Sequence, residues 1–221
     1  MAISEKTLEF LWQNRIKNSR EWYIEHKSEF QEFVLQPMIE LVEQLEKPLH
    51  EIDPLLVVIP KIGKSISRIH RDIRFSKDKT LYRDVMWCVF GRDKKKYSSP
   101  VFFIEFCPTF FRYGCGFYDT PPKYMESLRQ LIIKRDKRFL EAKKAYEKQN
   151  LFEIDGEFYK RNHFAEQPKE LQYWLNRKNI SFIKTSKDFP CLYKQDFYKE
   201  LIEGFRILTP MYYFLIAGEL L

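Results

Sequence analysis

Arginine residues recur at short intervals in the segment Ser67–Arg83, and they are the residues of this chain best suited to chemistry. Arg68, Arg71 and Arg74 follow one another with two residues between each pair. A guanidinium group presents parallel N–H donors that match the oxygens of a phosphate or a carboxylate, so closely spaced arginines suit an anionic ligand. Asp72 stands among them, where it could orient a guanidinium group or act as a base.

We predict that this segment forms one side of an anion-accepting cleft. The arginines would bind oxygens, Asp72 would orient them or act in catalysis, and two lysines would add attraction at the rim. The predicted ligand-binding residues are Arg68, Arg71, Asp72, Arg74, Lys77 and Lys79. A phosphorylated small molecule or a nucleic-acid end would be a natural partner for such a cleft. Whether the protein is an enzyme stays open at this point.

The distribution of charge singles out the same region. The chain of 221 residues has a formal net charge of +7. The stretch Lys61–Lys96 holds twelve basic and four acidic residues, which gives +8, so the remaining 185 residues sum to −1. One stretch therefore carries the whole positive excess.

Two other interpretations fit the same residues. The arginines and aspartates could form an internal ion-pair network that ties the segment to the rest of a structural or protein-interaction domain. The segment could also belong to a nucleic-acid-binding module, whose affinity would fall steeply with salt and depend little on Asp72. A network of the first kind would lose folding rather than ligand affinity when Arg71 or Asp72 is changed.

Apolar residues alternate with the arginines and should anchor the segment. In an extended backbone, Ile69, Ile73 and Phe75 would share one face with Arg71. Such anchoring would hold the guanidinium groups close together. The interpretation as a cleft requires them to be gathered, accessible to solvent and not already neutralised by carboxylates of the protein.

The block from Arg68 to Lys79, with the sequence RIHRDIRFSKDK and followed by Tyr82 and Arg83, resembles the signature of the family called domain of unknown function 2461. The resemblance extends over nearly the whole chain. Further matching features are Asn14, the Trp22 region, Pro37, Gly114 with Gly116, and Tyr159–Arg161. His70 stands where the family commonly has an aromatic residue, and Leu81 where it commonly has proline. The resemblance implies a fold and leaves function open.

The elements that must position this segment begin with helices. Leu8, Leu11 and Trp12 recur at helical spacing in residues 4–14. Ser19 is the predicted N-cap of a long helix that Pro37 should bend or interrupt. Later in the chain, residues 124–132, 139–146, 168–178 and 196–220 are also predicted to be helical, with Pro168 opening the third of these.

The middle of the chain is predicted to form strands. Runs rich in Val, Ile, Phe and Tyr predict strands at residues 55–60, 85–90, 101–107 and 110–117. Residues 151–159 are predicted to form a short strand or a hairpin around Asp155 and Gly156, and the alternation in residues 179–184 predicts another strand. Gly114 and Gly116 indicate a close backbone approach or a bulge. Helices, then strands, then helices favour an α+β fold: one domain over residues 1–221, with a mainly antiparallel sheet of about five strands packed by N-terminal and C-terminal helices.

Two charged features outside the segment also carry expectations. Glu105 lies within an apolar run, so its carboxylate should meet an arginine of the basic segment, with Arg71 as the candidate. Lys94, Lys95 and Lys96 are expected at the solvated tip of a hairpin, with a contact to a phosphate backbone as the alternative.

Several classes of function have no support in the sequence. The four cysteines and four histidines lack the close spacing of a zinc site, and no dinucleotide fingerprint, phosphate-binding loop or metalloprotease helix is present, so no metal or cofactor is implied. No apolar run approaches the ~18 residues of a transmembrane helix, and the N-terminus lacks a signal-peptide pattern, so we expect a cytoplasmic protein without a membrane partner. The oligomeric state is not indicated.

Overall fold

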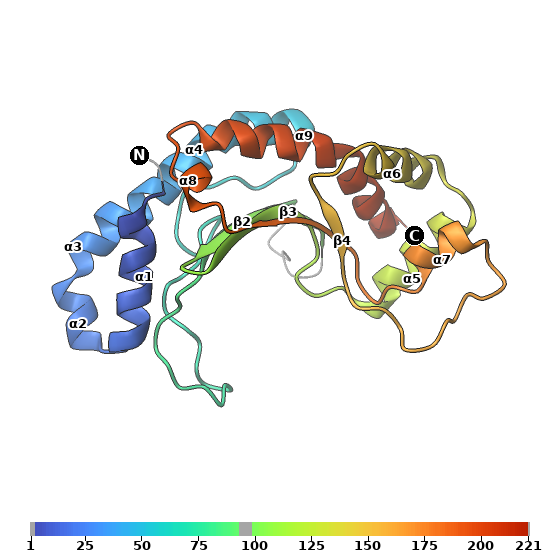
Figure 1. Cartoon of the computed structure of the whole chain (residues 1–221). Coiled ribbons are helices and arrows are strands. Elements are labelled where there is room, and N and C mark those ends of the chain that lie inside the picture. The colour runs from blue at the N-terminus through green and yellow to red at the C-terminus, as the bar shows by residue number, and fades with distance from the viewer. Residues whose placement is uncertain (1–2, 93–98, 221) are drawn as a thin grey trace. The chain divides into compact units, whose positions relative to one another are not determined.

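The structure, a computed structural model, describes residues 3–92 and 99–220, and Figure 1 shows strands flanked in sequence by helices. The chain divides into two compact units, each assembled from separate stretches. The first unit comprises Met1–Phe90, Phe103–Tyr113 and Thr185–Ile202, and the second comprises Gly91–Phe102, Gly114–Lys184 and Glu203–Leu221. The expectation of a single domain over residues 1–221 stays a prediction.

The helices that precede the strands are α1 (Glu5–Lys17), α2 (Arg20–Glu25), α3 (Lys27–Glu29), the π-helix η1 (Phe30–Leu35) and α4 (Gln36–Ile52). The later helices are α5 (Pro122–Ile133), α6 (Lys137–Glu147), α7 (Lys169–Leu175), α8 (Phe189–Leu192), α9 (Phe197–Ile216) and the 3-10 helix η2 (Ala217–Leu220). The strands are β1 (Met86–Gly91), β2 (Val101–Cys107), β3 (Phe110–Gly116), β4 (Glu153–Asp155) and β5 (Ser181–Ser186).

The strands form one open, antiparallel, five-stranded sheet in the order β1-β2-β3-β5-β4. In the register of its last pair, Ile154 of β4 lies opposite Phe182 of β5. Helix α9, near the C-terminus, supplies aromatic side chains to the strands: Phe102 of β2 lies 4.6 Å from Tyr212 of α9, ring centroid to ring centroid. The predicted α+β class and antiparallel sheet are confirmed.

The predicted close approach at the glycines of β3 is also confirmed. A Cβ atom on Gly114 would lie 2.0 Å from the carbonyl oxygen of Phe182, and one on Gly116 would lie 2.2 Å from the hydroxyl oxygen of Ser181. Both distances are far below van der Waals contact. Strand β5 therefore runs so close to β3 that only glycine fits at these positions.

Pro37 interrupts the long helical region as predicted, and a threonine from α1 compensates for it. Proline has no N–H, so it cannot donate to the carbonyl four residues earlier, which is that of Phe33. The hydroxyl of the buried Thr7 donates to this carbonyl at 2.5 Å instead. Just before Pro37 the backbone takes π-helical hydrogen bonds, with the Gln36 N–H reaching the Gln31 carbonyl. Pro48 lies inside α4, which continues to Ile52.

The strand predicted at residues 55–60 is wrong. Pro54 precedes this run and Pro60 ends it, and its backbone bonds to a side chain rather than to another strand. The Ser65 hydroxyl accepts from the N–H of Ile59 at 2.9 Å and donates to the carbonyl of Val57 at 3.2 Å. This run is therefore irregular, and it leads from α4 into the basic segment Ser67–Arg83.

The prediction for Glu105 identified the right kind of partner but the wrong residue. Its carboxylate accepts from Nε of Arg112, on the adjacent strand β3, at 2.6 Å. A neighbouring strand offers the closer cation, so Arg71 is not needed there. Lys94, Lys95 and Lys96 lie outside the described residues. Within residues 3–92 and 99–220, no helix combines the length and apolar character needed to cross a membrane.

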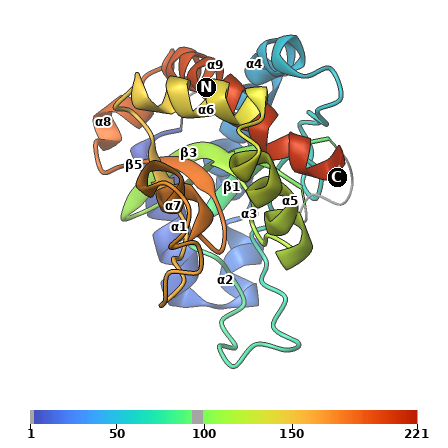
Figure 2. The same cartoon turned by 90° about the vertical axis from the view of Figure 1, so that its right-hand side faces the viewer.

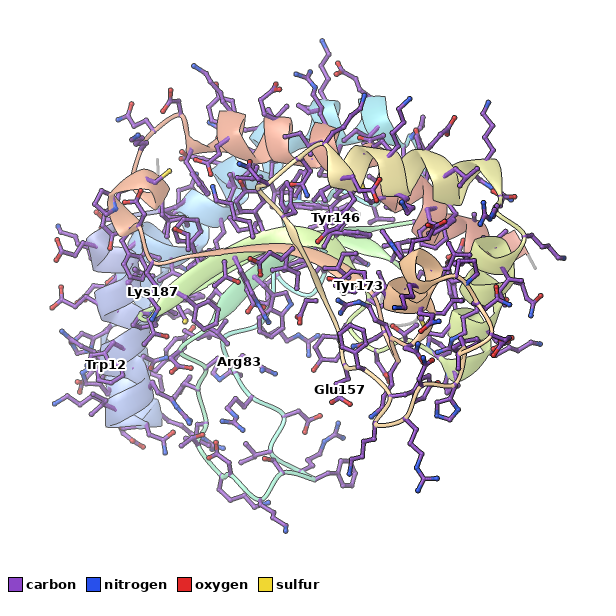
Figure 3. The ribbon with its side chains drawn as sticks, turned by 45° about the vertical axis from the view of Figure 1, so that its right-hand side comes forward. Trp12, Arg83, Tyr146, Glu157, Tyr173 and Lys187 are labelled. Carbon is purple, nitrogen blue, oxygen red and sulfur yellow. The ribbon has the colours of Figure 1, made fainter. Side chains whose placement is uncertain are left out.

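In the second unit, the buried Arg129 binds the C-terminal end of a helix. Arg129 of α5 donates through Nε to the carbonyl of Leu175 at 3.2 Å and through Nη2 to that of Arg177 at 2.9 Å. These carbonyls lie at the C-terminal end of α7, where a helix leaves acceptors unpaired and favours a cation. Trp174 of α7 lies 5.7 Å from Tyr146 of α6, ring centroid to ring centroid. Figure 3 labels Tyr146 and also Tyr173, which precedes Trp174 in α7.

Candidate functional site

A pocket of about 350 Å³ opens in the first unit, between α2 and the basic segment. Its lining residues are Arg20, Tyr23, Ile24, His70, Arg71, Ile73, Leu81 and Tyr82. The first three belong to α2, and the others come from the long loop that joins α4 to β1. This loop runs alongside α1 and α2 in Figure 1 and in Figure 2.

Backbone pairing within the loop closes one wall of the pocket. His70 and Tyr82 form an antiparallel bridge, and the N–H of Arg71 donates to the carbonyl of Leu81 at 2.8 Å. The N–H of Arg83 donates to the carbonyl of Ile69 at 2.9 Å. The two ends of the basic segment are thereby held side by side.

The end of α1 holds this wall in place. Asn18 terminates the helix in the left-handed conformation (φ 47°), and its side-chain oxygen accepts from the N–H of Leu81 at 2.7 Å. Nη1 of Arg15 donates to the carbonyl of Tyr82 at 3.4 Å. Ser19 then starts α2 as its predicted N-cap, accepting from the N–H of Trp22 at 3.2 Å. The corner between α1 and α2 therefore places α2 opposite the loop.

Aromatic rings form part of the lining. Tyr23 and Tyr82 stack with ring centroids 5.0 Å apart, and His70 meets Tyr23 edge-on at 5.2 Å. Burial raises the pKa of both phenols, so they remain protonated at neutral pH and keep their O–H donors. Tyr82 is buried, whereas Tyr23 is partly exposed.

Arg71 enters the pocket wall with only part of its guanidinium group engaged. Its Nη1 donates to the carboxylate of Asp78 and, at 2.9 Å, to the hydroxyl of Thr80. Nη2 of Arg15 reaches the same Asp78 oxygen at 3.3 Å. Hydrogen bonds from Thr80, and then from the two arginines, lower the pKa of Asp78 well below its usual value. In the described part of the chain, Nε and Nη2 of Arg71 have no hydrogen-bond acceptor.

Arg20 lines the other side of the pocket and was not predicted. Within residues 3–92 and 99–220, its guanidinium group takes part in no hydrogen bond or ion pair. Burial lowers the pKa of His70, and the positive charge of Arg20 lowers it further, so the imidazole is neutral at pH 7. A positively charged residue at the first position of a helix opposes the helix dipole, and this was the one sequence signal that could have drawn attention to Arg20.

The charges around the pocket do not cancel. The guanidinium groups of Arg15, Arg20 and Arg71 contribute +3, and the carboxylates of Asp78 and of Glu21, whose charge acts on Arg20 and Tyr82, contribute −2, which leaves +1. No Asp or Glu is among the lining residues. An anion that entered the pocket would meet positive potential and unused N–H donors.

The other predicted site residues lie outside the pocket lining. The fork of Arg74 is filled by Asp72: Nε to Oδ1 is 2.9 Å and Nη2 to Oδ2 is 2.7 Å. This pairing lowers the pKa of the Asp72 carboxyl to about 2, and the exposed carboxylate faces an arginine rather than the pocket. Nζ of Lys79 donates to the carbonyl of Ile73 at 2.9 Å. Of the predicted site residues, the structure thus brings only Arg71 into the pocket.

The exposure of the remaining residues of the basic segment tests the predicted anchoring. Arg68 and Lys77 are exposed, and Arg68 lies over Gly63, where an added Cβ would be 3.5 Å from its guanidinium nitrogens. Phe75, expected to be an anchor, is 95% exposed, so that expectation is wrong, whereas Ile69 is buried. After the bridge at His70 the chain leaves the core, and Phe75 has no apolar surface to pack against.

Comparison with models of protein families identifies the family of this chain. The model of the family described as "Conserved hypothetical protein (DUF2461)" matches residues 6–214. A search of curated proteins found no match. The matched range includes every residue of the pocket.

Proposed function

For a chain that belongs to the DUF2461 family of conserved hypothetical proteins, we propose binding of a small phosphate-type anion in the pocket between α2 and the basic segment. One observation carries the proposal. Arg20 and Arg71 line the same pocket from two different elements, and within the described residues both have guanidinium N–H groups without an acceptor. The anion would accept hydrogen bonds from these N–H groups, because no carboxylate of the pocket lining does so.

The chemistry of the lining supports an anion with several oxygens. Arg20 and Arg71 could each offer two N–H donors to it, and charge-assisted hydrogen bonds of this kind are the strong ones. The phenol of Tyr23 and the neutral imidazole of His70 could donate to further oxygens. The proposal concerns binding and assigns no reaction, because Asp72, the candidate base, is already held by Arg74.

The alternative of an internal ion-pair network describes part of the segment well. Arg74 with Asp72 is such a pair, and Arg71 shares Asp78 with Arg15. It leaves Arg20 without a role, because in the described residues no carboxylate pairs with this arginine. We therefore favour the pocket over a purely structural cluster.

Titration of inorganic phosphate at low ionic strength tests the proposal, with calorimetry or thermal shift as the readout. We expect Arg20→Gln and Arg71→Gln each to weaken binding about 10- to 100-fold, because a hydrogen bond to a charged group contributes about 1.5–3 kcal/mol. Arg74→Gln is the matched control: it removes the same charge from the same segment, but its guanidinium fork is already filled.

Two results would overturn the proposal. One is the absence of phosphate binding by the folded parent protein. The other is an equal loss of affinity in Arg20→Gln and Arg74→Gln, which would show that phosphate responds only to overall charge. If a short oligonucleotide bound instead, with a steep salt dependence and similar losses in both variants, nucleic-acid binding along the basic surface would replace the pocket as the conclusion.

A further inference from the structure

The pocket holds more apolar surface than a bare phosphate ion needs. Besides its cations and rings, the lining includes three aliphatic side chains, Ile24, Ile73 and Leu81. Ile24 is 69% exposed, although it is a large apolar residue that lines a pocket. Inorganic phosphate gains nothing from aliphatic contact, because each of its oxygens seeks a hydrogen-bond donor.

The size of the pocket also exceeds what the anion requires. A volume of about 350 Å³ falls in the range of roughly 300–1,000 Å³ in which proteins bind organic ligands. Such sites combine a mostly apolar lining with a few placed polar groups that fix orientation. Here the placed groups are Arg20 and Arg71, and the apolar lining comes from both walls.

We infer that the ligand is a phosphate monoester whose organic part is apolar or aromatic. The inference rests on the proposed function, since the phosphate group is held by Arg20 and Arg71. The organic part lies against Ile24 of α2 and against Ile73 and Leu81 of the loop. Contact between the organic part and these aliphatic side chains removes apolar surface from water, and this adds to the affinity. A sugar or a glycerol group keeps its hydration and would not gain this contribution.

Three phosphate compounds test the inference on the intact chain: inorganic phosphate, glycerol phosphate and phenyl phosphate. We expect phenyl phosphate to bind about 10-fold or more tightly than glycerol phosphate, because burial of an aromatic ring of this size is worth at least that factor. The measured quantity is the ratio of the two dissociation constants. This ratio cancels the contribution of the phosphate group that both ligands share.

Ile24→Asn should reduce this ratio several-fold, because it replaces an aliphatic contact with a polar side chain. Ile16→Asn is the control: Ile16 lies on α1, is 61% exposed and is outside the pocket lining. Trp12, labelled on the same helix in Figure 3, is 50% exposed, so α1 also presents apolar surface away from the pocket. The control variant should keep the ratio of the parent protein.

The outcomes separate the two proposals. Equal affinities for phenyl phosphate and glycerol phosphate would overturn the inference about the organic part and leave phosphate binding intact. An unchanged ratio in Ile24→Asn, or the same reduction in Ile16→Asn, would overturn it as well. Absence of binding by all three ligands would instead overturn the proposed function.

Discussion

Replacing Thr7 with valine should destabilise the first unit, because two backbone groups lose their partner. The Thr7 hydroxyl donates to the carbonyl of Phe33 at 2.5 Å and accepts from the N–H of Ser4 at 3.0 Å. Valine has nearly the same shape, so the substitution leaves no cavity. The change therefore isolates the hydrogen bonds from the packing.

The carbonyl of Phe33 sets the size of the effect. Thr7 is fully buried, and a buried acceptor without a partner costs about 1–3 kcal/mol. Pro37 cannot supply an N–H in place of the hydroxyl. We expect the free energy of unfolding to fall by about 2 kcal/mol, which corresponds to a decrease in Tm of roughly 4–8 °C for a chain of this size.

Urea denaturation of four proteins provides the assay: the parent, Thr7→Val, Pro37→Ala and the double variant. Alanine at position 37 restores an N–H that can reach the Phe33 carbonyl, so Thr7→Val should cost less in that background. The difference between the two costs is the coupling energy of the cycle. A cost below about 0.5 kcal/mol for Thr7→Val, or an equal cost in both backgrounds, would refute the account of Thr7 as the substitute donor.

Two further predictions concern the sheet and the pocket. Gly114→Ala should lower the free energy of unfolding by at least ~2 kcal/mol in urea denaturation, since its Cβ would lie 2.0 Å from the Phe182 carbonyl oxygen; no measurable loss would contradict the close approach. Binding of phenyl sulfate, whose charge is constant near neutral pH, should strengthen as the pH falls below about 6.5, because the bound anion raises the lowered pKa of His70 and proton uptake then accompanies binding. A titration series should show this slope in the parent and lose it in His70→Asn, and a slope that persists in the variant would exclude His70 as its source.

The sequence predicted strands best where the local pattern and the sheet demand the same residues. Val101–Cys107 forms β2 over the predicted range, because its Val, Ile and Phe side chains suit a strand and neighbouring strands pair with it. The run at residues 55–60 has a similar composition, but the Ser65 hydroxyl takes its backbone groups first. Composition cannot reveal a hydrogen bond to a side chain in a loop that has yet to fold.

The site was predicted in part for a similar reason. Arg71 was identified from its neighbours in the sequence, whereas Arg20 comes from a helix far away in the chain and meets Arg71 only through the fold. The sequence also could not predict which arginine each aspartate binds. Asp72 turns back to Arg74, while Asp78 reaches both Arg71 and Arg15, and only the path of the loop decides between these pairings.

Helix α2 supplies one wall of the pocket, and none of its six residues is fully buried, although Trp22 and Tyr23 are partly so. Elements with little buried apolar surface open locally at low free energy, well before the rest of a protein unfolds. A molecule that bridges Arg20 and Arg71 fastens this loosely held helix to the loop opposite. Occupancy would then slow the hydrogen exchange of the α2 amides, so the helix itself reports when the pocket is filled.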